Sequence, residues 1–206
     1  MIVIIDYSAG NLTSVKRALD YLKIPSAISP DPEVIVSAER IIFPGVGHAA
    51  AAMKTLRQHQ LDKALTSAFA AGTPILGICL GTQIILSHAE EGDTACLGII
   101  PGTVPRFALR DPSLKVPHMG WDAIIVKRTH PVLRDVGRSD EFYFVHSYYP
   151  RPSDSSAVIA TCEYEGEFPA VIGDKNIIGT QFHPEKSGPA GLNILKNFAA
   201  WDGAPC

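Results

Sequence analysis

Apolar runs recur along the first half of the chain at lengths typical of buried strands. They lie at 1–6, 27–29, 40–43 and 74–78, with polar or glycine-containing segments between them. Because the longer runs are continuous rather than alternating, they predict strands covered on both faces, as in a parallel sheet.

Helical patterns fill the segments between these runs. Segment 12–22 carries leucine and valine at helical spacing after Asn11, which we expect to be the N-cap. Asp31-Pro32 is typical of a cap followed by a first-turn proline. The alanine-rich segment 49–71 and the segment 80–89 also predict helices. This alternation of strand and helix predicts an α/β fold with helices on both faces of the sheet.

The second half of the chain changes character. Short β-rich runs separated by glycine and proline occupy 97–126 and 141–180, and Gly173–Asn176 predicts a hairpin turn. Ser187 then precedes a closing helix, and we expect it to be the cap. We therefore predict one domain over residues 1–206, built on a mixed but mostly parallel sheet.

Composition limits the classes of partner and the cellular compartment that we expect for this protein. The 206 residues are 46% hydrophobic and 19% charged with a net charge of −3, which favours neither nucleic acid nor an anionic membrane as the main partner. The apolar run after Met1 is too short for a signal or membrane segment. The cysteines form no CxxC pair, and free thiols favour a reducing cytosol, so we expect a cytoplasmic protein in which Cys96, Cys162 and Cys206 are structural.

Cys79 is the strongest candidate for chemistry. It lies in Gly77-Ile78-Cys79-Leu80-Gly81, directly after an apolar strand. A strand that ends in Gly-x-nucleophile-x-Gly is typical of a nucleophile elbow, in which a strained turn aims the side chain at the start of a helix. A lone cysteine after a strand is usually only a small buried hydrophobe, but the flanking glycines favour a nucleophile.

A histidine and a carboxylate follow about a hundred residues later, in Gln181-Phe182-His183-Pro184-Glu185. Together with Cys79 they predict a Cys–His–Glu triad, in which the base deprotonates the thiol and the acid orients the base. The alternatives are a structural histidine at a strand end or part of a metal site, although a metal needs more convergent ligands than lie nearby.

Other segments are ambiguous when taken alone. Pro44–Gly47 is either a tight turn or a loop that aims an N–H at a substrate oxygen. Gln83, one helical turn after Cys79, is either solvated or on the same face as the nucleophile. The aromatic run 142–149 fits a core strand or an interface equally well, and the segment 6–11 lacks the glycine pattern of a nucleotide site.

Taken together, these motifs resemble a known family. Gly-Ile-Cys-Leu-Gly-x-Gln with His-Pro-Glu resembles the triad, or class I, glutamine amidotransferases. The further matches are Asp-Tyr-x-x-Gly-Asn at 6–11, Pro-Gly-Val-Gly at 44–47, Lys-Val-Pro-His-Met-Gly-Trp at 115–121, Phe-Val-His-Ser-Tyr at 144–148 and Gln-Phe-His-Pro-Glu-Lys-Ser at 181–187. This ordered set is similar to the glutaminase subunits of imidazole glycerol phosphate synthase, which serve histidine biosynthesis.

The resemblance implies a fold, a reaction and a partner. The fold would be a flavodoxin-like, three-layer α/β glutamine amidotransferase fold. The chain would hydrolyse glutamine to glutamate and ammonia, and would form a heterodimer with a (β/α)₈-barrel cyclase subunit. Ammonia would reach the barrel by an internal path and yield imidazole glycerol phosphate and aminoimidazole carboxamide ribotide. No separate cofactor and no metal are expected.

The resemblance also implies residue roles at the matching positions. Cys79 would be the nucleophile, His183 the general base and then acid, and Glu185 the orienting carboxylate. Val46 and Leu80 would supply the N–H groups of an oxyanion hole.

Further roles concern the substrate and the partner. Residues expected to hold glutamine are Gly47, Gln83 and Glu91, the last as a carboxylate near the α-ammonium. Residues expected near the partner interface or the ammonia exit are Asn11, Trp121, Tyr143 and Lys186.

Two positions depart from the family pattern. Ser8 stands where the family usually has glycine, and Thr82 stands where it usually has methionine. Neither change removes a catalytic atom, so we expect them to alter rates rather than function.

Three rival functions remain open. One is the glutaminase subunit of pyridoxal phosphate synthase, against which the segments 115–121 and 144–148 argue. Another is a cysteine peptidase or γ-glutamyl hydrolase that uses the same elbow. The last is a thiol redox sensor, which would leave His183 and Glu185 without a purpose.

Overall fold

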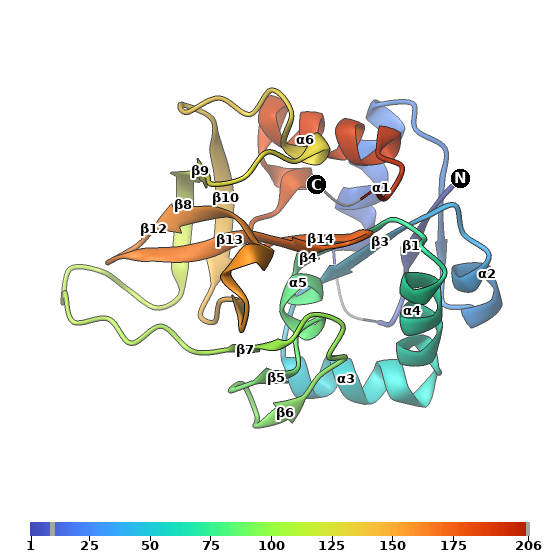
Figure 1. The fold of residues 1–206 in the computed structure, drawn as a ribbon, viewed down its shortest axis with the longest axis horizontal. Helices are drawn as coiled ribbons and strands as arrows, with labels where there is room; N and C mark the ends of the chain where they lie inside the picture. The colour runs from blue at the N-terminus through green and yellow to red at the C-terminus, as the bar shows by residue number, and fades with distance from the viewer. Residues whose placement is uncertain (9–10, 205–206) are drawn as a thin grey trace.

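A mixed sheet runs through the molecule, and the computed structural model, which describes residues 1–8 and 11–204, gives it eight strands in that part of the chain (Figure 1). Their order is β2-β1-β3-β4-β14-β13-β12-β9. The bounds are β1 (Ile2–Ile5), β2 (Ser26–Ser29), β3 (Arg40–Gly45), β4 (Ile75–Cys79), β9 (Ile125–Val126), β12 (Val158–Glu163), β13 (Glu167–Asp174) and β14 (Ile177–Thr180).

The strands from β2 to β14 are parallel to their neighbours, and β13, β12 and β9 extend the sheet in antiparallel fashion. The predicted hairpin turn is confirmed, because Asp174 pairs with Ile177 across β13 and β14. The prediction of a mixed, mostly parallel sheet is therefore confirmed as well.

Helices cover both faces of this sheet. Their bounds are α1 (Leu12–Tyr21), α2 (Pro32–Val36), α3 (Ala49–Gln58), α4 (Leu61–Ala70), α5 (Leu80–Ile84) and α6 (Gly188–Ala200). Helices α1 and α6 lie on one face, and α3, α4 and α5 lie on the other (Figure 1). Along β1, Ile2 and Ile4 pack towards α1 and α6, whereas Val3 and Ile5 pack towards the opposite helices. This explains why the strand runs are continuously apolar.

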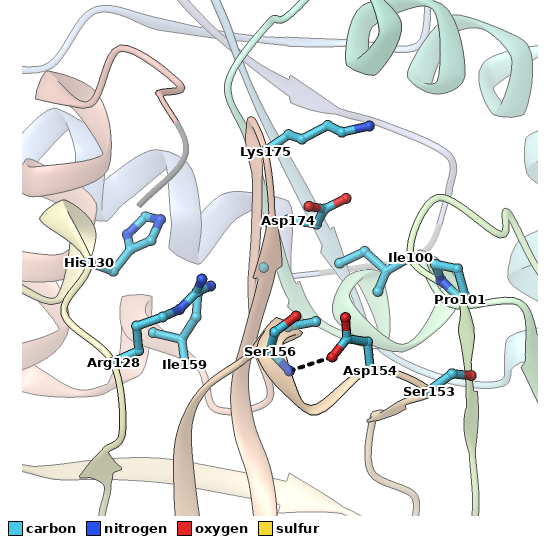
Figure 2. A pocket seen from close by; sticks show the side chains of 12 residues that line it. Ile100, Pro101, Arg128, His130, Ser153, Asp154, Ser156, Ile159, Asp174 and Lys175 are labelled. Carbon is cyan, nitrogen blue, oxygen red and sulfur yellow. Dashed lines mark hydrogen bonds between the residues drawn. The ribbon is translucent and has the colours of Figure 1, made fainter.

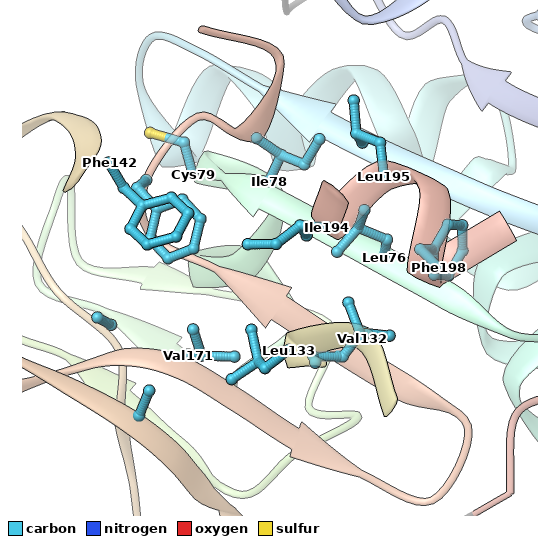
Figure 3. Packing of buried hydrophobic residues seen from close by; sticks show 14 of the residues in the cluster. Leu76, Ile78, Cys79, Val132, Leu133, Phe142, Val171, Ile194, Leu195 and Phe198 are labelled. Carbon is cyan, nitrogen blue, oxygen red and sulfur yellow. The ribbon is translucent and has the colours of Figure 1, made fainter. Parts of the chain in front are cut away.

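The core reaches the predicted nucleophile. Figure 3 shows Leu76 and Ile78 of β4 near Ile194 and Leu195 of α6, and Cys79 at the end of the strand near Phe142. These side chains are buried, and Ile75 of the same strand is buried in the cluster on the opposite face, so the strand that carries Cys79 is packed on both sides.

Smaller sheets and single turns complete the structure. In the described residues, β10 (Glu141–His146) pairs with β8 (His118–Ala123), and a further sheet has the order β11-β7-β5-β6. Its bounds are β5 (His88–Ala89), β6 (Thr94–Ala95), β7 (Gly102–Val104) and β11 (Arg151–Pro152), and the 3₁₀ turns are η1 (Pro131–Leu133), η2 (Ser155–Ala157) and η3 (Pro184–Lys186).

Two helix predictions are wrong in extent. The segment 49–71 contains α3 and α4 rather than one helix, because Gln60 adopts φ 58°, outside helical geometry. The segment 80–89 ends its helix at Ile84, and the chain then enters β5. Local helical propensity does not register these tertiary turns.

Two cap predictions are right in position but wrong in mechanism. Asn11 precedes α1, yet its Oδ1 accepts from the Ser14 hydroxyl instead of capping a backbone N–H. Ser187 precedes α6, but its hydroxyl donates to the His183 carbonyl at 2.6 Å and accepts from Tyr143 N at 3.0 Å. Only Asp31 caps as expected, by accepting from Glu33 N.

The remaining predictions concern the cysteines, membrane spans, the domain count and residues that the structure does not describe. Ala9, Gly10 and Cys206 lie outside the described residues. Cys162 is buried in the core and Cys96 is half-buried, and both are free thiols. Within the described chain, the helices include none with the length and apolar character required to cross a membrane. The single domain over residues 1–206 stays a prediction.

We expect His130→Asn to reduce the loss of stability on acidification. Burial, reinforced by the charge of Arg128, lowers the pKa of His130 from 6.5 to about 4. Between these values the unfolded chain binds a proton that the folded chain excludes, so stability falls as pH decreases through that window. This linkage amounts to about 2 kcal/mol at pH 5.

Urea unfolding at pH 7 and pH 5 measures the effect. Asparagine is chosen because the His130 ring accepts from Val132 N, a cap that an asparagine oxygen also provides. The exposed His59→Asn is the matched control. If His130→Asn lost as much stability as the parent between the two pH values, the explanation would be wrong.

Candidate active site

The carboxyl ends of three adjacent parallel strands bring the predicted site together. Gly45 at the end of β3 is level with Cys79 at the end of β4. On the other side of β4, Thr180 at the end of β14 is level with Ile78, so the chain leaving β14 passes the nucleophile and reaches His183. Segments far apart in sequence therefore meet at one edge of the sheet.

Cys79 occupies the predicted elbow. Its backbone has φ 54° and ψ −109°, and α5 begins at the next residue. A Cβ at Gly77 would lie 3.1 Å from the backbone of Thr82, and one at Gly81 would overlap the Phe43 carbonyl oxygen. The flanking glycines are required because the strained turn and the neighbouring strand pack backbone against backbone.

His183 and Glu185 form a buried pair. Their side chains are 2% and 1% exposed, and His183 Nδ1 lies 2.8 Å from Glu185 Oε1. Because the carboxylate accepts, Nδ1 carries the proton and Nε2 is left for other chemistry. Neither His183 Nε2 nor Glu185 Oε2 has a hydrogen-bond partner among the described residues.

The electrostatics of the pair favour a charged imidazole. Burial by itself lowers the pKa of His183, but interactions with Cys79 and Glu185 outweigh it and raise the pKa to about 10. The thiol acts through its proximity, because Nε2 makes no hydrogen bond of standard geometry to a described group. This environment is typical of a cysteine and histidine that share a proton.

A cavity of about 290 Å³ opens over Cys79 and His183. It is lined by Val46, Gly47, Cys79, Leu80, Gln83, Glu91, Pro117, Val145, His146, Ser147, Tyr148 and His183. The residues predicted for the oxyanion hole and for substrate binding thus lie around the same space. Glu185 lies behind His183 rather than in the lining.

The two predicted polar substrate ligands are held by neighbours. Glu91 Oε2 accepts from Ala49 N at 2.7 Å, at the start of α3. Gln83 Nε2 donates to Tyr148 O at 2.8 Å and to Gln181 Oε1 at 2.9 Å. The neighbouring Glu90 accepts a hydrogen bond from Arg106 N through its Oε2.

Comparison with known proteins agrees with this geometry. A family model described as glutamine amidotransferase class-I matches residues 3–201. A relative from Nitratidesulfovibrio vulgaris, named imidazole glycerol phosphate synthase subunit HisH, is 50% identical, with 98% of this chain and 97% of the relative covered. A protein of the same name from Chromobacterium violaceum is 42% identical, with 98% of each covered. This chain belongs to the class-I glutamine amidotransferase family.

Solved structures share the amidotransferase fold at low sequence identity. PurLQS from Thermotoga maritima matches with a TM-score of 0.74 and 17% identity, covering 97% of each chain. A structure described as a glutamine amidotransferase matches with a TM-score of 0.73 and 18% identity, covering 98% of this chain and 100% of the other. The predicted three-layer α/β fold of the family is therefore confirmed.

Three of the four residues predicted to face a partner form a cluster in this amidotransferase. Trp121 and Tyr143 pair across β8 and β10 with ring centroids 5.8 Å apart, and Lys186 Nζ lies 5.6 Å from the Tyr143 ring. The Tyr143 ring is 6.3 Å from that of His183, so this cluster adjoins the site. Asn11 bonds instead to its own helix, through Ser14.

The two departures from the family pattern have structural explanations. Ser8 has φ 60°, a left-handed conformation that glycine adopts without strain. The Thr82 hydroxyl donates to the Thr180 carbonyl at 2.7 Å. It thereby links α5 to β14, the strand that leads to His183.

Residues that sequence reasoning missed also reach the site. Gln181 is fully buried and its Nε2 lies 3.6 Å from Cys79 Sγ. Tyr7 is buried, its hydroxyl has no partner among the described groups, and its pKa is raised by burial and then by the charge of Cys79. His146 lines the cavity. The only signal for Gln181 was its place in the 181–187 motif.

A second cavity of about 380 Å³ contains none of the predicted site residues. Figure 2 shows Arg128, His130 and Asp174 among its lining residues, and shows Asp154 accepting from Ser156 N. Charges of both signs surround it. The candidate active site is the smaller cavity, because Cys79 and His183 line it.

We expect Thr82→Val to destabilise the fold by about 1–2 kcal/mol, because it removes a buried donor and leaves the Thr180 carbonyl without it. Thr66→Val is the matched control, since the Thr66 hydroxyl also donates to a backbone carbonyl but is exposed. Urea denaturation measures both variants. Equal effects of the two substitutions would contradict a special contribution from the α5–β14 link.

Proposed function

We propose that the chain hydrolyses glutamine to glutamate and ammonia through Cys79, His183 and Glu185. We further propose that it delivers the ammonia to a (β/α)₈-barrel cyclase in histidine biosynthesis, which makes imidazole glycerol phosphate and aminoimidazole carboxamide ribotide. The observation that carries the proposal is the single cavity that joins Cys79 and His183 to Gln83 and Glu91. The names of the relatives support the pathway and a multisubunit enzyme.

The proposed first step forms an acyl-enzyme. His183 holds the proton of Cys79, and the thiolate attacks the side-chain amide carbon of glutamine. The N–H groups of Val46 and Leu80 stabilise the oxyanion, at about 3–4 kcal/mol per donor. His183 then protonates the departing nitrogen, the C–N bond breaks, and ammonia leaves behind a γ-glutamyl thioester.

The second step regenerates the enzyme. His183 takes a proton from water, the hydroxide attacks the thioester carbon, and the C–S bond breaks to release glutamate and the thiolate. Glu185 keeps the imidazole oriented through its bond to Nδ1. Glu91 would bind the α-ammonium of glutamine, while Gln83 and Gly47 would position the rest of the substrate.

The partner proposal follows from the chemistry of ammonia and from the surface beside the site. Ammonia must travel uncharged, because ammonium has no lone pair with which to attack. Met119 and Trp121 are 62% and 50% exposed, which is unusual for large apolar side chains, and Trp121 contacts Tyr143 next to His183. We propose that the cyclase covers this surface and receives the ammonia there, with Lys186 and Asn11 at the same interface.

We expect Cys79→Ala to abolish glutamine-dependent synthesis by the complex, by about 10³-fold or more, and to leave ammonia-dependent synthesis intact. The matched control is Cys96→Ala, since burial raises the pKa of Cys96 to about 11 and removes it from this chemistry. Product formation is measured with each nitrogen donor. Loss of both activities in Cys79→Ala would indicate that Cys79 is structural.

Glutamate release tests the role of the partner. We expect little release by the chain alone, and a large rise when the cyclase and its nucleotide substrate are both present, because unpartnered turnover would waste glutamine. Full activity of the isolated chain would instead indicate an ungated hydrolase, and cleavage of γ-glutamyl peptides would favour the peptidase-like rival. Silence in every mixture would overturn the proposed function.

A further inference from the structure

A path of buried hydrogen bonds reaches Cys79 through Gln181, a residue without a role in the reaction proposed above. Gln181 is fully buried, two residues before His183, and its Nε2 lies 3.6 Å from Cys79 Sγ. A buried amide requires partners for both of its ends. One end of Gln181 therefore uses the nucleophilic sulfur as its partner.

The orientation of the Gln181 amide follows from its neighbours. Tyr148 O is a carbonyl and can only accept, so the Gln83 group beside it at 2.8 Å must be Nε2. The same Gln83 Nε2 lies 2.9 Å from Gln181, and the atom that it meets there must be an acceptor, Oε1. The remaining Gln181 group, Nε2, is consequently the one that faces the sulfur.

The Tyr148 carbonyl is itself held by a histidine. His146 Nδ1 lies 2.8 Å from Tyr148 O, so this nitrogen carries a proton and donates. Burial lowers the pKa of His146 to about 3, so the ring is neutral and its Nε2 accepts. Its partner, 3.1 Å away, is His118 Nδ1, which must therefore donate.

The outer end of this path is the contact between His118 and Asp122. His118 Nε2 lies 2.7 Å from Asp122 Oδ2, and a carboxylate accepts. The His118 ring also stacks on Tyr164, with centroids 4.1 Å apart. His146 and Gln83 both donate to the Tyr148 carbonyl, and from Gln83 onward the donors point toward the sulfur, through Gln181 Oε1 and then Gln181 Nε2.

We propose that Gln181 is a further catalytic residue, which donates an N–H hydrogen bond to the Cys79 sulfur and is locked in that orientation by Gln83. A hydrogen bond to an ionised acceptor is stronger than one to a neutral acceptor, so the bond favours the thiolate over the thiol. It acts when the thiolate attacks glutamine and again when the thiolate leaves the thioester. The inference rests on the proposed function for its catalytic consequence, although thiolate stabilisation is measurable without it.

The main test uses Gln181→Met, which preserves length and removes the donor. The rate at which iodoacetamide alkylates Cys79 is followed against pH, and the Cys79 peptide is identified by mass. We expect alkylation to slow about tenfold at neutral pH and to approach the parent rate at high pH, where the thiol ionises without help. The titratable groups that face the sulfur, His183 and Tyr7, are unchanged in this variant.

Two further variants serve as a control and as a second test. Gln58→Met, at an exposed position of α3, is the control and should match the parent. Gln181→Glu is almost identical in size but places an oxygen against the sulfur, so it should slow alkylation at neutral pH at least as much as Gln181→Met. It also serves where Gln181→Met fails to fold. An unchanged alkylation profile in a folded Gln181 variant would overturn the inference.

Turnover separates this inference from the proposed function. In the complex with the cyclase, Gln181→Met should lower kcat for glutamine about tenfold with KM unchanged, because Gln181 touches the sulfur rather than the substrate. Ammonia-dependent synthesis should be unaffected. A parent protein without glutaminase activity would remove the proposed function, yet the alkylation profiles would still decide whether Gln181 stabilises the thiolate. A raised KM with normal alkylation would show that Gln181 only shapes the cavity.

Discussion

The left-handed backbone at Cys79 is the constraint from which the geometry of the site follows. A non-glycine residue at φ 54° is strained, and it persists only where the surroundings impose it. Here they do so because α5 starts at the next residue and Gly81 presses against the Phe43 carbonyl of β3. Strands β3 and β4 pair directly and end level with each other, so Val46 and the nucleophile line one cavity. A larger residue at Gly81 would separate these segments before it altered any catalytic group.

Around this elbow, buried polar groups are arranged in two sets. In the first set, His183 and Glu185 form a pair whose outer atoms, Nε2 and Oε2, have no partner among the described residues. Unmet hydrogen-bonding capacity in a buried site is costly, and its position beside a cavity is typical of a site that binds a polar ligand. The second set is a path of hydrogen bonds in which Tyr148 O, Gln83 and Gln181 lead to Cys79, and His118 with Asp122 forms the outer end. We propose proton transfer for the first set, and for the second set the orientation of the Gln181 amide toward the sulfur.

Much of this was predictable because the relevant signals are local. The strand runs, the glycines around Cys79 and the His-x-Glu spacing each reflect a constraint within a few residues, and each has the expected backbone or contact in the structure. The roles of these side chains in glutamine hydrolysis remain proposals. The predictions that were wrong required tertiary information. Nothing in the segment 49–71 signals a break at Gln60, and nothing near Ser187 shows that its hydroxyl would bind the His183 carbonyl instead of capping α6.

The sequence by itself determined the layered α/β architecture and singled out Cys79, His183 and Glu185 as candidates for the nucleophile, the base and the orienting acid, because apolar periodicity and a glycine-flanked turn are properties of short segments. Only the tertiary structure decided which polar groups meet across those segments. Gln181 and Cys79 are separated by 102 residues, and Gln83 meets Tyr148 across 65. Which end of a buried amide faces the sulfur depends on every other donor and acceptor in that path, and no local pattern encodes such an arrangement.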